Sequence, residues 1–149
     1  MVSLLPMEPI EELLNEVRLL WHRQVQVGER LHTQEPVTLG MRAVLEFLAR
    51  EGPATVPGIA RSRHVTRQHV QALANGLLAR RLVELADNPA HKRSPLVRLT
   101  RAGERTIRRM KAREAPLLAR CAVGVSRSDV KKAVEALRAV RAGLGGTRR

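Results

Sequence analysis

The chain has 149 residues, 44% of them hydrophobic, and a formal net charge of +13 at pH 7. A chain of this length can bury about 70% of its unfolded surface in one domain, and its single cysteine excludes a disulfide framework within the chain. No apolar run approaches the roughly 18 residues of a membrane span, and the N-terminal segment lacks the pattern of a signal peptide, so a cytoplasmic protein is expected.

The positive charge is concentrated in residues 37–149, which hold 24 Lys and Arg against eight Asp and Glu, a net of +16. Residues 1–36 hold three Arg and six Glu, a net of −3. Such a basic body predicts a polyanionic partner. Single-stranded nucleic acids and membrane surfaces are usually bound with aromatic side chains, but this chain has one Trp, one Phe and no Tyr. Duplex DNA is therefore the expected partner.

Residues 8–32 are predicted to form a first helix with a broad apolar face, made of Ile10, Leu13, Leu14, Val17, Leu20, Trp21, Val25 and Leu31. We expect so broad a face on a helix at the domain edge to pack on a second subunit; packing on its own domain is the alternative. Thr38 is predicted to cap a second helix that ends at Gly52-Pro53 and turns four residues inward, Met41, Val44, Leu45 and Leu48.

Residues 55–80 are predicted to form two short helices joined by a tight turn. The first begins at Thr55, whose hydroxyl can cap it, with Val56, Ile59 and Ala60 on one side. The second runs from Thr66 to about Arg80, and its inward stripe consists of Val70, Leu73 and Leu77. This arrangement is typical of a helix-turn-helix, whose second helix enters the major groove of DNA.

The polar residues near the start of the second helix are candidate DNA contacts. Arg67, Gln68 and Gln71 are predicted to touch base edges, because Arg can bind guanine and Gln adenine through paired hydrogen bonds. Residues around the turn and along the flanks are predicted to contact the DNA backbone: Thr55, Arg61, Ser62, Arg63, Thr66, His69 and Asn75. The alternative for all of them is a solvated helix face.

Two strands are predicted next, at residues 82–86 and 96–99, joined by a polar loop, residues 87–95, that carries His91, Lys92, Arg93 and Ser94. Thr100 is then expected to cap a long helix over residues 101–122, which Pro116 would kink or break. Its predicted inward residues are Ile107, Met110, Leu117, Leu118 and Cys121. Ser126 begins a last helix with a stripe of Val130, Val134, Leu137 and Val140, and residues 143–149 are expected to form a flexible basic tail.

The order of these elements resembles the winged helix-turn-helix of the MarR family. The resemblance covers residues 37–110 well, and its most specific parts are the loop NPAHKRSPL and the following VRLTRAGE. It implies a mainly α fold with a winged DNA-binding core at residues 37–100. Residues 1–36 and 101–142 would then be helical dimerisation segments.

The resemblance implies a homodimeric regulator, expected to be a repressor, whose recognition helices enter major grooves of a pseudo-palindrome while wings enter minor grooves. Arg93 stands where the family has an Arg that enters the minor groove, with His91, Lys92 and Ser94 beside it. The family's usual glycines after the two short helices are His64 and Arg81 here, and its usual wing Asp is His91. By analogy, a small-molecule effector could release the DNA.

The sequence leaves other functions open as alternatives. The high charge would also suit an architectural protein that binds DNA without sequence preference. Cys121 could make the protein an oxidant sensor, but its place on an apolar stripe predicts a buried, unreactive thiol. The five His residues show no ligand spacing for a metal, and no phosphate loop, nucleophile motif or paired carboxylates indicate an enzyme, so no metal or other cofactor is expected.

Overall fold

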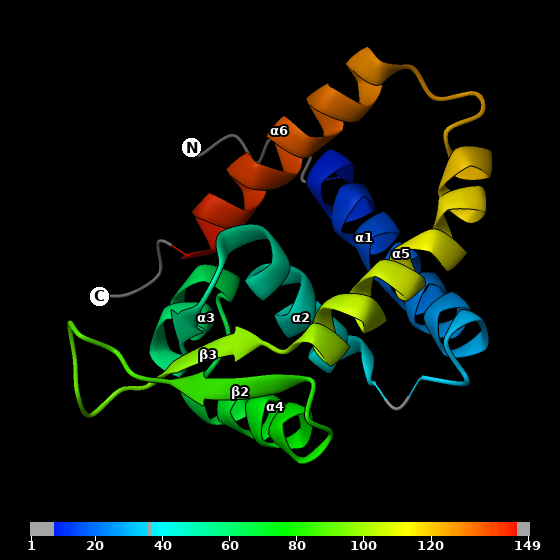
Figure 1. Ribbon diagram of the computed structural model, residues 1–149. Coiled ribbons are helices and arrows are strands. Elements are labelled where there is room, and N and C mark those ends of the chain that lie inside the picture. Colours follow the sequence, from blue (N-terminus) through cyan, green and yellow to red (C-terminus); the bar gives the residue numbers. More distant parts are fainter. Residues whose placement is uncertain (1–7, 36, 146–149) are drawn as a thin grey trace, which may run out of the picture. The chain divides into compact units, whose positions relative to one another are not determined.

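The computed structural model describes residues 8–35 and 37–145, and it is mainly helical with one small sheet, as predicted (Figure 1). The chain divides into two compact units, the described residues up to Lys111 and those from Ala112 onward. The elements in chain order are α1 (Glu8–Leu31), α2 (Leu39–Glu51), β1 (Ala54–Thr55), α3 (Val56–Arg63), α4 (Arg67–Ala79), β2 (Val83–Ala86), β3 (Leu96–Leu99), α5 (Arg101–Cys121) and α6 (Arg127–Gly145).

The core of the first unit lies where α2, α3, α4 and the sheet meet. Its most completely buried side chains come from each of these elements and from α5: Val44, Leu45, Ile59, Val70, Leu77, Val97 and Met110. The inward faces predicted for α2 and α4 are confirmed, because Met41, Leu45 and Leu48 are buried in the first and Val70 and Leu77 in the second. The opposite face of α4 is exposed at Arg67, Gln68 and Gln71.

Threonine hydroxyls cap the helices of this unit. The hydroxyl oxygen of Thr38 accepts a hydrogen bond from the Met41 N–H at 3.2 Å, and that of Thr55 from the Gly58 N–H at 3.1 Å. Thr66 does the same for α4. Each cap satisfies a backbone donor that has no partner within its helix, which fixes where the helix begins. The predicted caps are therefore confirmed.

The sheet contains a strand that the sequence did not predict. Its order is β1-β3-β2, and both neighbouring pairs are antiparallel. β1 pairs Ala54 with Val97 and Thr55 with Leu96, and it is too short for an alternating pattern to reveal it. β2 begins one residue later than predicted, at Val83, because the Leu82 N–H bonds back to the carbonyl of Leu77 in the turn that ends α4.

Left-handed residues end α3 and α4 in the same way. His64 and Arg81 both have φ of 56°, although neither is glycine. Beside His64, the Val65 N–H donates to the Ala60 carbonyl at 3.1 Å; the Leu82 N–H makes the corresponding bond beside Arg81 at 3.0 Å. These are Schellman turns, in which the following N–H reaches back to satisfy a free carbonyl of the helix.

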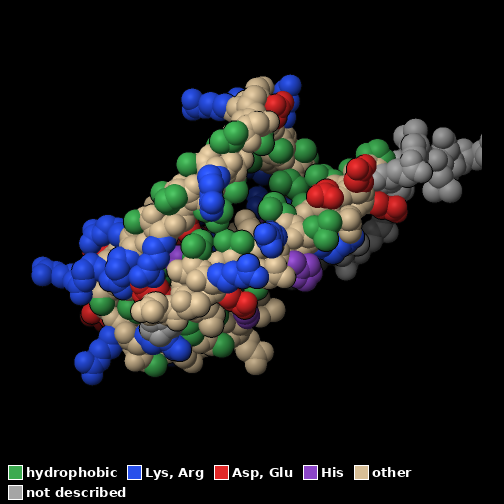
Figure 2. All heavy atoms as spheres, turned by 90° about the vertical axis from the view of Figure 1, so that its right-hand side faces the viewer, with side chains coloured by type: hydrophobic (Ala, Val, Ile, Leu, Met, Phe, Trp, Pro, Cys, Tyr) green, Lys and Arg blue, Asp and Glu red, His purple; other side chains and the backbone are tan. Residues whose placement is uncertain are grey.

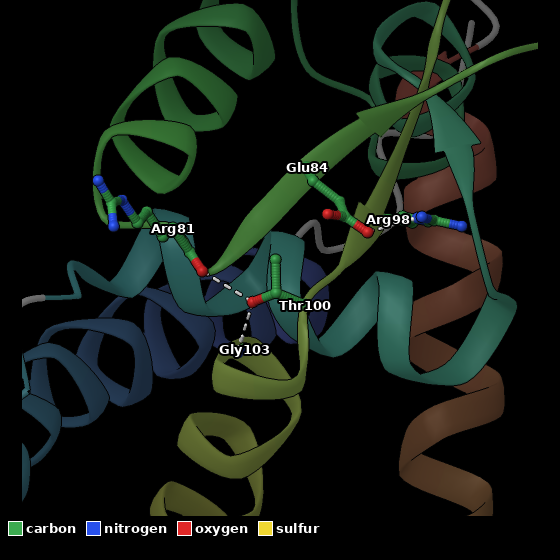
Figure 3. A network of polar contacts seen from close by, with 5 residues as sticks. All are labelled: Arg81, Glu84, Arg98, Thr100 and Gly103. Carbon is green, nitrogen blue, oxygen red and sulfur yellow. Dashed lines mark hydrogen bonds and ion pairs between the residues drawn. The ribbon is translucent and has the colours of Figure 1, made fainter.

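The start of α5 is held against the end of α4 (Figure 3). The Thr100 hydroxyl donates to the carbonyl of Arg81 at 2.7 Å and accepts from the Gly103 N–H at 3.1 Å. The carbonyl of Leu82 lies so close to Gly103 that an added Cβ would overlap it. Close by, Glu84 and Arg98 form an ion pair of 2.7 Å between β2 and β3.

The second half of α5 departs from the prediction. Pro116 does not break the helix, which runs to Cys121. Ile107 and Met110 are buried as predicted. Leu118 and Cys121, however, are exposed rather than inward, so the prediction of a buried thiol was wrong. The apolar stripe packs on the core only along the first half of the helix.

The last helix starts as predicted and ends later. The Ser126 hydroxyl accepts from the Asp129 N–H at 3.1 Å and donates to the Asp129 carboxylate at 2.6 Å. The helix continues to Gly145, so the expected tail at 143–149 begins later, and its last four residues lie outside the described part of the chain. Val130, Val134 and Leu137 are exposed on it.

Gly103 provides a test of the packing at the start of α5. Gly103→Ala should lower the free energy of unfolding by about 1–3 kcal/mol, because the new methyl group would push against the Leu82 backbone. Gly143→Ala is the matched control, since it adds the same methyl group within a helix where no atom lies within 4 Å. Urea titration of both variants measures the difference; equal stability would contradict this account of the junction.

Candidate nucleic-acid interface

The first two turns of α4 present the predicted base-contacting side chains to solvent. Arg67, Gln68 and Gln71 are all exposed, whereas Val70 and Ala74 of the same helix are buried. The buried residues anchor α4 on the core and thereby fix the direction of the exposed ones. The N-terminal end of the helix is consequently free to enter a groove.

Gln71 has a partner on its own helix. Its Nε2 atom donates to Oδ1 of Asn75 at 2.9 Å, one helical turn further along. Asn75 was predicted to contact the DNA backbone, but here it holds the amide of Gln71. The bond uses one N–H of Gln71 and leaves the second N–H and Oε1, which are the donor and acceptor that adenine requires.

Asn88 closes the loop between β2 and β3. Its Nδ2 atom donates to the carbonyl of Ser94 at 2.8 Å, and its Oδ1 atom accepts from the Ala90 N–H at 3.2 Å. Backbone bonds from His91 to Asn88 and from Ser94 to His91 complete the loop. Sequence reasoning missed this residue, although Asn before Pro is a recognised turn signal.

A hollow of about 420 Å³ joins α4 to this loop. Its rim brings Arg67, Gln68 and Gln71 together with Arg93 and Ser94. The rest of the lining consists of Asn75 and of apolar side chains, including Val56, Pro57, Ala74, Leu78, Leu85 and Val97. The predicted base contacts and the predicted minor-groove Arg thus share one surface.

Except for Asn75, the other predicted contacts do not line this hollow. Around the turn between α3 and α4, the exposed ones are Arg61, Ser62, Arg63, Thr66 and His69. His91 and Lys92 are exposed in the loop. The hydroxyls of Thr55 and Thr66 already accept backbone hydrogen bonds, so only their protons remain for a phosphate. Within residues 8–35 and 37–145, no group of three or more His, Cys, Asp or Glu could hold a metal.

Positive charge predominates on this surface, although the loop that follows β2 begins with Asp87. No Asp or Glu occurs between Glu51 and Glu84, whereas that stretch holds five Arg. On the face drawn in Figure 2, Lys and Arg side chains are also more prominent than Asp and Glu. A surface with such an excess of cations attracts phosphate groups over several ångströms. In the described part of the chain, no helix is both long enough and apolar enough to cross a membrane.

Comparison with known proteins agrees with this geometry. Residues 42–94 match the model of the MarR family. The uncharacterized protein Rv2011c of Mycobacterium tuberculosis is 38% identical over 94 residues, which cover 58% of this chain and 66% of that protein, just under two thirds.

Solved structures share the fold along nearly the whole chain. MarR family transcription regulator SP03579 is 28% identical, with a TM-score of 0.79 over 95% of this chain and 96% of that one. The regulator BldR from Sulfolobus solfataricus has the same fold at 17% identity, with a TM-score of 0.79 over 93% of this chain and 99% of its own. These matches lead to one conclusion: residues 42–94 carry a MarR-family segment, and the chain has the winged-helix fold of MarR-family transcription regulators.

Proposed function

We propose that this protein is a homodimeric, sequence-specific regulator that represses transcription by binding a pseudo-palindromic DNA duplex in the cytoplasm. The observation that carries the proposal is the hollow in which Arg67, Gln68 and Gln71 of α4 meet Arg93 of the wing, residues 87–95. A helix with exposed Arg and Gln beside a basic loop suits one major groove and the minor groove next to it.

In this proposal α4 reads bases and its surroundings bind phosphates. Arg67 is suited to guanine, and Gln71, steadied by Asn75, is suited to adenine; each such pair contributes about 1–3 kcal/mol of discrimination. The exposed residues around the turn would orient the helix through the DNA backbone, without reading sequence: Arg61, Ser62, Arg63, Thr66 and His69.

The wing would place Arg93 in a narrow minor groove, where the negative potential is strongest. His91 replaces the usual Asp of the family and cannot hold Arg93 by a strong ion pair when it is neutral. Asn88 supplies a different support, because its side chain bonds both sides of the loop. The wing would therefore be ordered before it meets DNA.

Exposed apolar side chains support the proposal of a dimer. On α1, Leu20 and Trp21 are 59% and 55% exposed, and Ile10 and Val17 are also exposed. Apolar side chains gathered on one helix mark an interface more often than a solvated surface. The apolar stripe of α6 would join the same interface. Two recognition helices about 34 Å apart, one turn of DNA, would then read the two half-sites. A small-molecule effector that changes this spacing would release the DNA.

Selection from a random duplex library at about 150 mM salt tests sequence reading. Purified protein should enrich a two-fold symmetric motif. Arg67→Ala and Gln71→Ala should each weaken binding to it by about 1–3 kcal/mol and relax one position in each half-site, whereas Arg93→Ala should affect the flanking A·T-rich positions. Tight, salt-sensitive binding without any enriched motif would contradict the proposal and favour the architectural alternative.

Asn88 gives a test of the wing. Asn88→Ala should weaken binding to the selected motif almost as much as Arg93→Ala, because the loop loses the bond to Ser94. The double variant should bind the motif only slightly more weakly than either single variant, since both substitutions act through the Arg93 side chain. Asn88→Asp loses the donor and adds a negative charge beside the Ser94 carbonyl and the DNA, so it should weaken binding at least as much as Asn88→Ala. Additive effects in titrations with the double variant would show that Asn88 does not act through Arg93.

Trp21 gives a test of the dimer. Trp21→Glu should convert the protein to a monomer at micromolar concentration, because a carboxylate replaces an apolar contact in the proposed interface. Light scattering after size-exclusion chromatography measures the mass. Arg23→Glu, on another face of α1, is the control and should leave the mass unchanged. A monomeric parent protein, or a variant that stays dimeric, would exclude this interface.

A further inference from the structure

The first half of α5 carries a stripe of cations that the proposed function does not use. Arg101, Arg105, Arg108 and Lys111 follow one another at intervals of three or four residues, and all four are exposed. Residues on the other side of the same turns are buried: Gly103, Thr106, Ile107 and Met110. The four cations, which we call the α5 stripe, therefore point away from the core.

The α5 stripe keeps an excess of positive charge, although Glu104 lies three residues from Arg101 and four from Arg108 on the same helix. Nearby arginines are paired, since Arg98 contacts Glu84 at 2.7 Å and Arg109 binds Glu35 through two hydrogen bonds of 3.1 and 3.2 Å. The hydrogen bond and charge of Glu35 raise the pKa of Arg109. Within the described residues, no member of the α5 stripe has an ion pair. Like charges three or four residues apart destabilise a helix, so this arrangement carries a cost that an anionic partner would remove.

The α5 stripe belongs to a surface separate from the hollow at α4. Arg108 and Lys111 line a second hollow, together with Glu104 of the same helix, the end of α2, and Arg98 and Leu99 of β3. The two hollows have no lining residue in common. In Figure 1, α4 lies below the strands, whereas α5 leaves the end of β3 toward α2. A straight duplex held by α4 and the wing would leave the α5 stripe available.

The chemistry of the α5 stripe fits a phosphate backbone better than a protein. Its residues span about 15 Å along the helix, with cations spaced about 5–6 Å apart. No large hydrophobic side chain is exposed between Arg101 and Lys111, whereas protein interfaces have an apolar centre. There is also no aromatic side chain to stack on bases. Duplex DNA, bound without regard to sequence, is the partner that these features favour.

We propose that the α5 stripe binds the phosphate backbone of a second DNA segment while α4 and the wing hold the operator, so that one dimer bridges two duplexes. The inference rests on the proposed function, since it requires the operator to occupy α4. It adds a bridging activity that operator recognition does not need. Removal of one cation that binds a phosphate should reduce the salt slope of second-duplex binding by about 0.9.

A capture assay tests the proposal. A 30-bp duplex with the selected motif is immobilised and saturated with protein, and a fluorescent duplex of scrambled sequence is added at about 100 mM salt. The parent protein should retain the second duplex. The variant Arg105→Glu/Arg108→Glu should retain at least tenfold less, while its affinity for the immobilised motif changes less than threefold. Lys131→Glu/Lys132→Glu is the control: it changes net charge equally on exposed residues of α6 and should capture like the parent.

The other outcomes separate the two proposals. Equal capture of the second duplex by the parent and by the Arg105/Arg108 variant would mean that the two recognition surfaces of the dimer bridge the duplexes. An equal loss of capture in the Lys131/Lys132 control would mean that net charge alone matters. Either result overturns the inference and leaves the proposed function intact. Retention of poly-glutamate but not of the second duplex would overturn it in favour of an acidic protein partner. A parent protein that does not bind the immobilised motif overturns the proposed function itself.

Discussion

The Thr100 hydroxyl is the point on which the arrangement of this domain depends. It donates to the last turn after α4 and accepts from the first turn of α5, while the Thr100 N–H bonds the carbonyl of Leu82 at 3.1 Å. The absence of a side chain at Gly103 is what permits this approach. The end of the recognition helix, the returning strand of the wing and the start of α5 therefore cannot move independently, and a shift of α5 must reach α4.

The local sequence predicted most of this domain because several independent signals coincide. The recognition helix has a hydroxyl residue before its first turn and an apolar stripe of helical period, and both signals indicate nearly the same start and length. His64 stands where the resemblance implies a glycine, and the structure has left-handed backbone there. Such features depend on residues within a few positions of one another, which is why a single sequence reveals them.

Features that depend on distant residues could not be predicted. β1 exists only because β3, some forty positions later, offers it hydrogen bonds. Cys121 continues the helical stripe of Ile107 and Met110, but periodicity cannot tell how far along α5 the core extends, so the thiol was wrongly expected to be buried. For the candidate site, helical spacing predicted which side chains are exposed, whereas their meeting with Arg93 around one hollow depends on how the wing folds back toward α4.

The two Schellman turns without glycine also affect the unfolded chain. A left-handed His or Arg costs about 1–2 kcal/mol of native strain, which is a reason to expect glycine at positions 64 and 81. Glycine, however, leaves the unfolded backbone freer and costs about 0.4–1 kcal/mol in entropy at each position. His64 and Arg81 thus add strain to the folded turns, but they also lower the conformational entropy of the unfolded chain. The two effects on the free energy of unfolding partly cancel. The sharp ends of α3 and α4 are maintained at a net cost smaller than the strained dihedral angles suggest.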